Sequence, residues 1–472
     1  MPKCHLFFGP GFFVSAARFI FDSKERYRFS PMRRTVHHTF AHNCFCLLAV
    51  WGFIASLQGC AAIKGAQEKP RFVPVHTEKD IERHNFPATR GEDVIGRLAM
   101  VRVEEGDTLA DIARHFGLGL NAISAANPGV DPWVPRAGER ILLPLSFILP
   151  DAPRKGIVIN LATMRLFHYK GSGTAQVVST YPVGVGAEDR PTPPGPTRVV
   201  RKAAKPTWHV PASIAERHRM KGDILPASIP PGPDNPLGEY ALYLGKAGYL
   251  IHGTNKPASV GLQATNGCMR LYPENIKTLF GETPVNTPVL IVNQPYLVGR
   301  RDGALYVEAH GSSESSNSGE LLKMHDKLRS MEKKSARPLD WNRIKEVEAR
   351  SLGIPVPVPV SGPDQGSKKE LPETVEVEHP GNLYGKPAVP EMTKDAWYVQ
   401  AAYMRDETDA RRLAAIITHQ GPPIPARIVP KSGGGYRVIA GPFKDGDEAR
   451  DAAKRIKYDL EIDAFVFDAS RK

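Results

Sequence analysis

The sequence contains little cysteine and no hydrophobic run long enough to cross a membrane securely. Its 472 residues include five Cys, which excludes a disulfide scaffold in a chain of this size. The best apolar run, residues 44–57, has 14 residues without a charge, whereas a spanning helix needs about 20. Hydrophobic residues make up 41% and charged residues 24%, so the chain is not wholly disordered. Its length is sufficient for roughly three domains.

The N-terminal region has the features of a bacterial export signal. Met32-Arg33-Arg34 precedes the apolar run, and Leu57-Gln58-Gly59-Cys60 follows it, as expected of a signal peptide. The last four residues resemble the lipobox of lipoproteins, in which the signal is cut before a Cys that then carries diacylglycerol. We therefore predict a signal peptide over residues 1–59, a start at Met32 and lipidation of Cys60. A signal anchor that is never cleaved is the alternative.

Removal of the signal peptide changes both the charge and the cysteine count. Residues 1–59 contain seven Lys or Arg and two Asp or Glu, so the formal charge falls from +12 to +7. This mild charge and an exported location argue against a nucleic-acid partner. Three cysteines leave with the signal, and Cys60 would be acylated, so Cys268 is the remaining thiol. A lone thiol in an oxidising compartment is a candidate nucleophile.

A small module is predicted after a polar, Pro-containing tether at residues 60–97. Residues 98–146 follow the order strand, helix, helix, strand, and Asp107 or Thr108 is expected to cap the first helix. The strings GDTL at 106–109, ANP at 126–128 and AGERILLP at 137–144 resemble those of LysM. That resemblance implies a βααβ module that binds peptidoglycan or chitin.

Residues 153–296 are rich in predicted strands. Gly156–Asn160 and Arg165–Tyr169 alternate apolar and polar residues, as half-buried strands do. Turns at Pro191–Pro196 and Pro230–Pro236 interrupt the series, which favours a mainly β, antiparallel architecture. Residues 311–394 then combine a Ser-rich start, a charged helical stretch and Pro/Gly-rich sequence, for which we predict a mobile linker.

Residues 395–472 return to the pattern of a folded domain. The order β-α-β-β-α-β predicts an α+β, ferredoxin-like sheet with both helices on one face. Asp406 and Asp447 are expected to begin the two helices. The strings at 398–400 and 436–443 resemble the SPOR domain of cell-division and envelope proteins, which binds glycan strands stripped of their stem peptides.

The chemistry is expected at His252 and Cys268. The Pro and Gly residues between them exclude a single helix, so a loop that returns to the same strand end would bring the two together. The thiolate is the reactive form of cysteine, and a neighbouring imidazole can take its proton. Gly267 allows close approach of substrate and frees the amides of 267 and 268 for an oxyanion.

The surrounding strings resemble the L,D-transpeptidase (YkuD-type) catalytic domain. They are Tyr249-Leu-Ile-His-Gly-Thr-Asn255, Thr265-Asn-Gly-Cys-Met-Arg270, Tyr181–Gly186 and Thr192–Gly195. The resemblance implies that Cys268 is the acylated nucleophile, that His252 is the general acid/base, and that the Gly253 carbonyl orients His252. It also implies a multidomain peptidoglycan enzyme made of a LysM-like, a catalytic and a SPOR-like unit.

Substrate binding is expected from side chains around this pair, namely Tyr249, Thr254, Asn266 and Arg270. The alternative role for Arg270 is to support the loop that carries Cys268. One departure is visible: the family usually has Ser-His-Gly-Cys, whereas this chain has Asn266 in the His position. Asn keeps its hydrogen bonds but does not titrate, so a role for a second histidine is in doubt.

The resemblance also implies the reaction. Cys268 would attack the carbonyl between diaminopimelate and the terminal D-alanine of a tetrapeptide stem, and an amine would resolve the thioester. That amine would come from a second stem or from an envelope lipoprotein, whereas water would make the enzyme a carboxypeptidase. A non-catalytic scaffold that binds peptidoglycan is the alternative. No metal or cofactor is expected, and Ala61 after Cys60 favours a lipid anchor in the outer membrane over one in the inner membrane.

Overall fold

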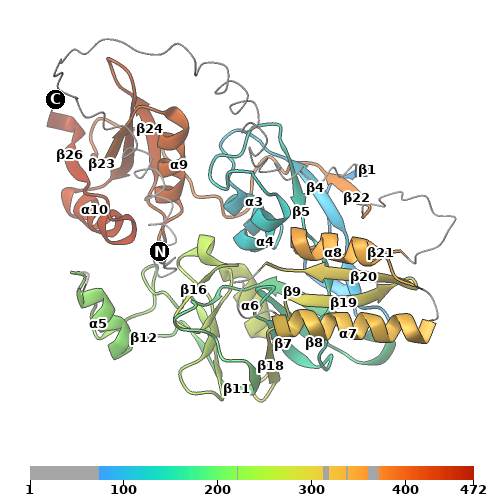
Figure 1. Cartoon of the computed structure of the whole chain (residues 1–472). Helices are drawn as coiled ribbons and strands as arrows, with labels where there is room; N and C mark the ends of the chain where they lie inside the picture. The colour runs from blue at the N-terminus through green and yellow to red at the C-terminus, as the bar shows by residue number, and fades with distance from the viewer. Residues whose placement is uncertain (1–73, 221, 312–317, 336–337, 360–371, 472) are drawn as a thin grey trace, which may run out of the picture. The chain divides into compact units, whose positions relative to one another are not determined.

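The computed structural model describes residues 74–220, 222–311, 318–335, 338–359 and 372–471 (Figure 1). The predicted signal peptide, Cys60 and the first part of the predicted tether therefore lie outside the described residues. Over the ranges that are described, none of the helices combines the length and the apolar character that a membrane span requires.

Strands between residues 156 and 292 form most of a nine-stranded sheet. The strand order is β17-β15-β14-β11-β18-β7-β8-β9-β2. Most neighbours are antiparallel, as predicted, but β15 with β17 and β18 with β7 are parallel pairs. The bounds are β2 Asn85–Pro87, β7 Gly156–Asn160, β8 Arg165–Lys170, β9 Val177–Pro182, β11 Gly195–Ala204, β14 Tyr240–Leu244, β15 Leu250–His252, β17 Met269–Arg270 and β18 Pro288–Val292.

Fully buried apolar side chains hold this sheet to helix α6 (Pro273–Glu282). Proline at the first position suits the start of a helix, because its missing N–H has no intrahelical partner there. Ile276 and Leu279 of α6 pack in one cluster with Ile251 of β15 and Met269 of β17. The shorter elements of this region are η1 Gly173–Ala175, β10 Val185–Gly186, β12 Trp208–His209, α5 Ala212–Met220, β13 Ser228–Ile229, η2 Pro257–Ser259 and β16 Gln263–Thr265.

The LysM-like unit has the predicted order of elements. They are β4 Leu98–Arg102, α3 Leu109–His115, α4 Leu120–Ala126 and β5 Arg140–Leu143, with β4 and β5 antiparallel. Thr108 caps α3: its hydroxyl accepts the amide hydrogen of Asp111, whose carboxylate accepts the amide of Thr108 in return. This reciprocal arrangement satisfies two donors at the helix start.

The predicted tether and mobile linker were wrong over much of their length. β1 (Pro74–Glu78) and β22 (Thr374–Val377) join β4 and β5 in a four-stranded sheet, and β3 (Val94–Gly96) pairs with β6 (Ser146–Ile148). The supposed linker also forms ordered helices and strands that pack on a sheet. These are α7 Ser318–Ser335, α8 Trp341–Arg350 and β21 Val356–Val358, the last beside β19 Tyr296–Arg301 and β20 Ala304–Ala309.

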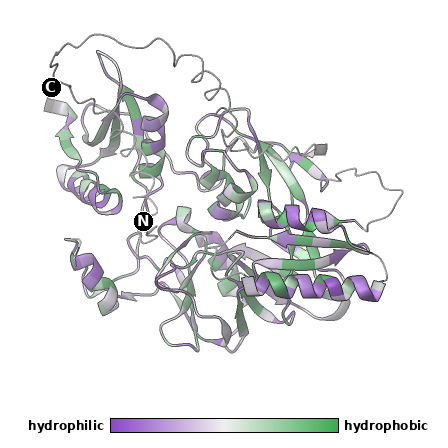
Figure 2. Ribbon diagram, in the orientation of Figure 1, coloured by the Kyte–Doolittle hydropathy of each residue, from purple (hydrophilic) through white to green (hydrophobic). Residues whose placement is uncertain are grey.

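Burial of apolar residues explains this order. Ile344 and Val347 of α8 are three residues apart and therefore lie on the same face of the helix. They pack in one cluster with Leu98 and Leu142 from the LysM-like strands. Figure 2 shows α7 and α8 banded in purple and green, as expected for helices with one buried face. The abundant charges and prolines of this segment concealed the apolar spacing that gives it a core.

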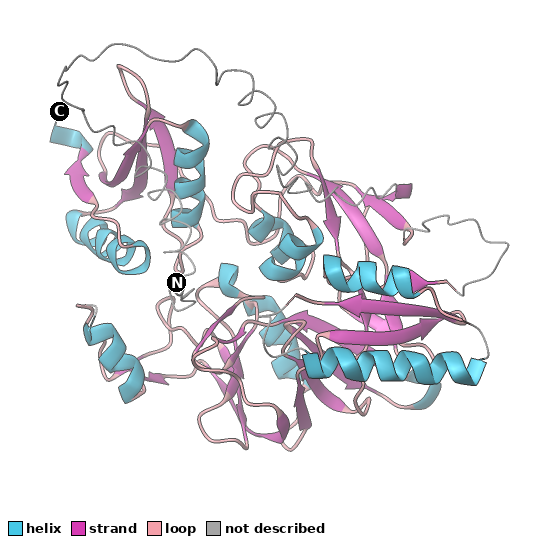
Figure 3. Cartoon of the chain, viewed as in Figure 1, coloured by secondary structure: helices cyan, strands magenta, loops and turns pink. Residues whose placement is uncertain are grey.

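The C-terminal unit has the predicted ferredoxin-like topology, with strand order β24-β25-β23-β26 and all pairs antiparallel. Figure 3 shows its strands beside the helices α9 and α10. Both helices pack on one face, with Val399 and Val438, whereas Tyr398 lies in a separate cluster on the other face. Asp406 caps α9 as predicted, but Asp445 rather than Asp447 caps α10. The bounds are β23 Trp397–Met404, α9 Glu407–Thr418, β24 Ala426–Pro430, β25 Tyr436–Phe443, α10 Gly446–Leu460, β26 Phe465–Asp468 and η3 Ala469–Arg471.

Two glycines let the LysM-like unit approach the loop between His252 and Cys268. The amides of Leu120 and Asn121, at the start of α4, donate to the carbonyls of Val260 and Gly261 at 3.2 and 3.3 Å. A Cβ added at Gly119 would lie 2.7 Å from the Cα of Gly261. The first turn of α4 therefore supports this loop through its backbone.

Gly119→Ala is expected to lower the midpoint of thermal unfolding by several degrees. Gly119 has φ −88°, which alanine adopts freely, so the cost comes from the contact with Gly261 and is about 1–3 kcal/mol. Differential scanning fluorimetry measures the shift. Gly281→Ala is the matched control, because it lies in α6 with no atom within 4 Å of its added Cβ. Equal midpoints for the two variants would contradict the close contact.

Candidate active site

The parallel pairing of β15 with β17 places Cys268 and His252 on neighbouring strands. Ile251 is in register with Met269, and His252 is in register with Arg270. Ile251 and Met269 are both fully buried in the core. His252 directly follows Ile251, and Cys268 directly precedes Met269. Because successive side chains along a strand point to opposite faces, His252 and Cys268 both point away from the core that buries Ile251 and Met269. The structure thus brings the two predicted residues to one side of the sheet edge.

His252 is held as a neutral imidazole. Its side chain is buried, and Nδ1 lies 2.6 Å from the carbonyl oxygen of Gly253. A carbonyl only accepts, so Nδ1 carries the proton and Nε2 keeps its lone pair. Burial, with the charge of Arg270 second, lowers the pKa of His252 to about 3 against the opposing effect of the Gly253 and Leu237 backbone. The ring can therefore accept a proton at neutral pH.

Cys268 is partly buried and protonated at rest. Its Sγ donates to the carbonyl oxygen of Gly248 at 3.5 Å. Burial raises the pKa of the Cys268 thiol, although the backbone of Leu250 and the charge of Arg270 act in the other direction. A thiol in this state needs a base at the moment of attack.

The loop before Cys268 is closed by the hydroxyl of Thr265. This hydroxyl donates to the carbonyl of Cys268 at 2.7 Å and accepts the amide hydrogen of Gly267 at 3.2 Å. In this structure the Gly267 amide donates to Thr265, so an oxyanion would have to replace that hydrogen bond, and the oxyanion role of Gly267 stays a prediction. The amide of Cys268 itself is the other donor that was predicted.

Glycine is required at position 267. Its φ of +101° is unfavourable for other residues, and an added Cβ would lie 2.8 Å from the ring of Tyr249. The hydroxyl of Thr192 donates to the Gly267 carbonyl at 2.8 Å and accepts the amide of Gly186 at 3.0 Å. Tyr249, predicted to bind substrate, thus packs against the loop that carries Cys268.

Arg270 and Thr254 make internal contacts. The Nη1 of Arg270 donates to the hydroxyl of Ser259 at 2.9 Å, and burial lowers its pKa to about 10. This contact matches the loop-supporting role, which was the alternative to substrate binding. Thr254 is buried and its hydroxyl accepts the amide of Lys256 at 2.9 Å. This hydroxyl closes a turn inside the protein, and substrate binding by Thr254 stays a prediction.

Asn266 is exposed and is the acceptor of two arginines that the sequence did not reveal. Its Oδ1 accepts from Nη1 of Arg190 and, at 2.6 Å, from Nη2 of Arg217. The two arginines lie 76 and 49 residues from Asn266. No local pattern indicates such a contact, since only the fold brings the three segments together.

The described residues also include possible metal ligands. Across the residues that the structure describes, no group of three or more His, Cys, Asp or Glu side chains is arranged to hold a metal ion.

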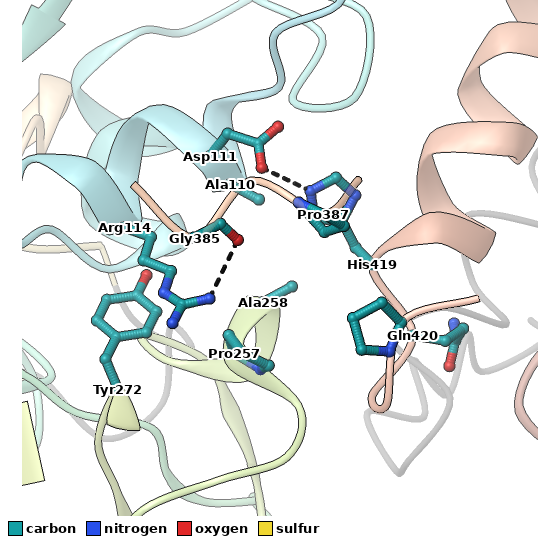
Figure 4. A pocket seen from close by; sticks show the side chains of 11 residues that line it. Ala110, Asp111, Arg114, Pro257, Ala258, Tyr272, Gly385, Pro387, His419 and Gln420 are labelled. Carbon is teal, nitrogen blue, oxygen red and sulfur yellow. Dashed lines mark hydrogen bonds and ion pairs between the residues drawn. The ribbon is translucent and has the colours of Figure 1, made fainter. Parts of the chain in front are cut away.

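A separate cavity of about 40 Å³ lies between α3, η2 and the residues after α9 (Figure 4). His419 and Asp111 point toward one another across it, with Nε2 of His419 2.9 Å from Oδ1 of Asp111. Burial alone would lower the pKa of His419, but the hydrogen bond and charge of Asp111 outweigh it and raise the pKa. The pair therefore joins the LysM-like and C-terminal units most strongly when His419 is protonated.

His419→Gln is expected to reduce amide protection in α3 and α9, and to do so more at pH 6 than at pH 9. A raised histidine pKa gives a stabilisation that is complete below about 6.5 and is lost as the pH rises through the folded-state value. Hydrogen–deuterium exchange at the two pH values measures this difference. Exposed His209 supplies the control, His209→Gln, and an effect that grows with pH would contradict the ion pair.

Known families match three parts of the chain. Residues 154–291 match the L,D-transpeptidase catalytic domain (YkuD), residues 101–144 the LysM domain and residues 393–467 the SPOR domain. These matches confirm all three resemblances inferred from the sequence. LysM and SPOR domains bind peptidoglycan, which indicates a location in the periplasm of the cell envelope.

Full-length relatives extend the match. The probable L,D-transpeptidase YcfS of Escherichia coli (strain K12) is 43% identical over 226 residues, which cover 47% of this chain and 70% of the relative. The probable L,D-transpeptidase ErfK/SrfK of Salmonella typhimurium (strain LT2) is 37% identical over 285 residues, 58% of this chain and 90% of the relative. The chain belongs to the L,D-transpeptidase family, and the enzyme acts on peptidoglycan.

Solved structures of the same class are more distant. The catalytic domain from the E. faecium L,D-transpeptidase is 22% identical, and the match covers 30% of this chain and 99% of that structure at a TM-score of 0.23. The Ldtfm–avibactam carbamoyl enzyme is also 22% identical with a TM-score of 0.23, and the match spans about half of that chain, 51%.

Proposed function

We propose that this protein transfers peptidoglycan stem peptides through a thioester on Cys268. The observation that carries the proposal is the neutral, buried His252, fixed through Nδ1, on the strand beside a protonated Cys268. In the first step Nε2 of His252 accepts the thiol proton while sulfur attacks the carbonyl between diaminopimelate and D-alanine. The carbon–nitrogen bond breaks, and the proton passes from His252 to the departing amine of D-alanine.

The second step regenerates the enzyme. An acceptor amine attacks the thioester, His252 takes a proton from that amine, and the Cys268 sulfur leaves and is reprotonated. The acceptor amine belongs to a second stem or to a lysine of an envelope lipoprotein. In this mechanism the amide of Cys268 stabilises the oxyanion, while Gly253 and Arg270 position His252 and the loop.

The other modules would keep the catalytic domain at its substrate. We place the LysM-like unit at residues 98–146, the catalytic unit at 153–296 and the SPOR-like unit at 395–472. Two peptidoglycan-binding modules and a lipid on Cys60, held in the outer membrane, raise the effective concentration of stem peptides near Cys268. This arrangement favours transfer between polymer-bound groups over reaction with free peptides.

Product analysis on tetrapeptide muropeptides tests the function. The purified full chain is incubated with disaccharide tetrapeptides, and the products are analysed by mass spectrometry. D-alanine release together with cross-linked dimers supports transpeptidation, and tripeptides without dimers indicate that water is the acceptor. An absence of D-alanine release would refute the catalytic proposal.

One observation favours a non-catalytic scaffold instead. Asn266 stands where the family usually has histidine, and its side chain is engaged by two arginines. Intact-mass measurement after incubation with a carbapenem separates the two functions. A covalent adduct on Cys268 supports the enzyme, whereas an unmodified protein supports the scaffold.

A further inference from the structure

Two arginines from distant segments converge beside the nucleophile loop. Arg190 follows β10 and Arg217 lies in α5, and both guanidinium groups donate to the single Oδ1 of Asn266. Asn266 is exposed and precedes Cys268 by two residues. The cluster is therefore on the surface that a peptide reaching Cys268 must approach.

The cluster has a surplus of positive charge. Nε of Arg190 also pairs with the exposed carboxylate of Asp189 at 3.1 Å, whereas the acceptor shared with Arg217 is an uncharged amide. Burial and then the proximity of Arg190 lower the pKa of Arg217, as expected for two cations held close together. Each guanidinium has five N–H donors, so one bond to Asn266 leaves most of them for another acceptor.

The substrate of the proposed reaction supplies acceptors of the right kind. A tetrapeptide stem carries the carboxylate of its terminal D-alanine and the side-chain carboxylate of diaminopimelate, both close to the bond that Cys268 attacks. Guanidinium groups bind carboxylates through paired, charge-assisted hydrogen bonds. An Asp or Glu at position 266 would neutralise the charge of the arginines. Asn266 accepts their hydrogen bonds and orients them, but leaves their positive charge in place.

We propose that Arg190 and Arg217, oriented by Asn266, bind a carboxylate of the donor stem peptide. This inference rests on the proposed function, since it uses the donor of that reaction. Asn266 thus acts as a positioning residue, and the two arginines determine specificity for an anionic donor.

Equilibrium binding to variants made in a Cys268→Ala background tests the arginines without turnover. Isothermal titration calorimetry with a soluble tetrapeptide is expected to show about tenfold weaker binding for Arg190→Gln and for Arg217→Gln. Asn266→Asp should weaken binding to a similar extent, because it places an internal carboxylate on both guanidinium groups. Arg219→Gln is the matched control: it removes a charge from the same helix, and the guanidinium of Arg219 pairs with Glu216 rather than with Asn266.

Amidated donors identify the carboxylate. If the terminal D-alanine carboxylate is the ligand, a D-alaninamide donor binds about tenfold more weakly to the Cys268→Ala protein and is insensitive to the arginine substitutions. If the diaminopimelate carboxylate is the ligand, a donor amidated at that carboxylate shows the tenfold weaker binding and the insensitivity to the arginine substitutions. Unchanged affinity in both arginine variants, or equal losses with both amidated donors, would overturn the proposal. Failure of the proposed function appears separately, as an absence of D-alanine release by the unsubstituted enzyme.

Discussion

Cys268→Ala is expected to reduce D-alanine release from tetrapeptide muropeptides by at least about a thousandfold, because loss of a catalytic nucleophile removes the covalent route altogether. The side chain is small and only partly buried, so the midpoint of thermal unfolding should change by no more than a few degrees. A coupled assay for D-alanine measures the rate, and intact-mass analysis should show no acyl adduct on the variant.

Cys268→Ser sharpens this test. The hydroxyl fits the same space, but its pKa is far above that of a thiol, and a neutral imidazole deprotonates it poorly. We expect this variant to fold normally and to remain nearly as slow as Cys268→Ala. Release of D-alanine by either variant at the rate of the unsubstituted enzyme would show that another group performs the chemistry.

His252→Gln is expected to lower kcat by about 10²–10⁴-fold, the usual contribution of a general acid/base. Glutamine can still donate to the Gly253 carbonyl, so much of the local structure should survive although the base is lost. Steady-state kinetics on the soluble tetrapeptide measure the change, and circular dichroism checks the fold. Exposed His209 supplies the control substitution, His209→Gln, and equal rates for the two variants would contradict the assignment.

The pH dependence of kcat/KM gives an independent test of His252. In the proposed mechanism the base is the neutral imidazole of His252, whose pKa of about 3 keeps it unprotonated over the whole neutral and mildly acidic range. The rate should therefore stay level between about pH 8 and pH 5 and not fall near 6.5. The same lowered pKa makes folding less favourable as the pH falls from 6.5 toward 3, so the fold is monitored at each pH. An acidic limb centred near 6.5 would contradict a buried base.

The local sequence predicted most individual elements but not the assembly. Residues 156–160 form the predicted strand, and Thr108 and Asp406 cap helices as expected, because these features depend on nearest neighbours. The predictions of a linker and a tether were wrong. Ile344 and Val347, in the supposed linker, are buried because they pack against strands from the LysM-like unit. Composition describes a segment by itself and cannot report the partner that buries it.

The sequence alone determined the family and the departure at Asn266, and it predicted the pair Cys268 and His252, because these are matters of which residue stands at which place in a motif. Tertiary structure decided the state of those residues. Burial and the Gly253 carbonyl set the charge of His252, Thr265 takes the Gly267 amide, and two distant arginines meet at Asn266. Each of these depends on desolvation or on contacts between segments far apart in the chain, which exist only once the chain has folded.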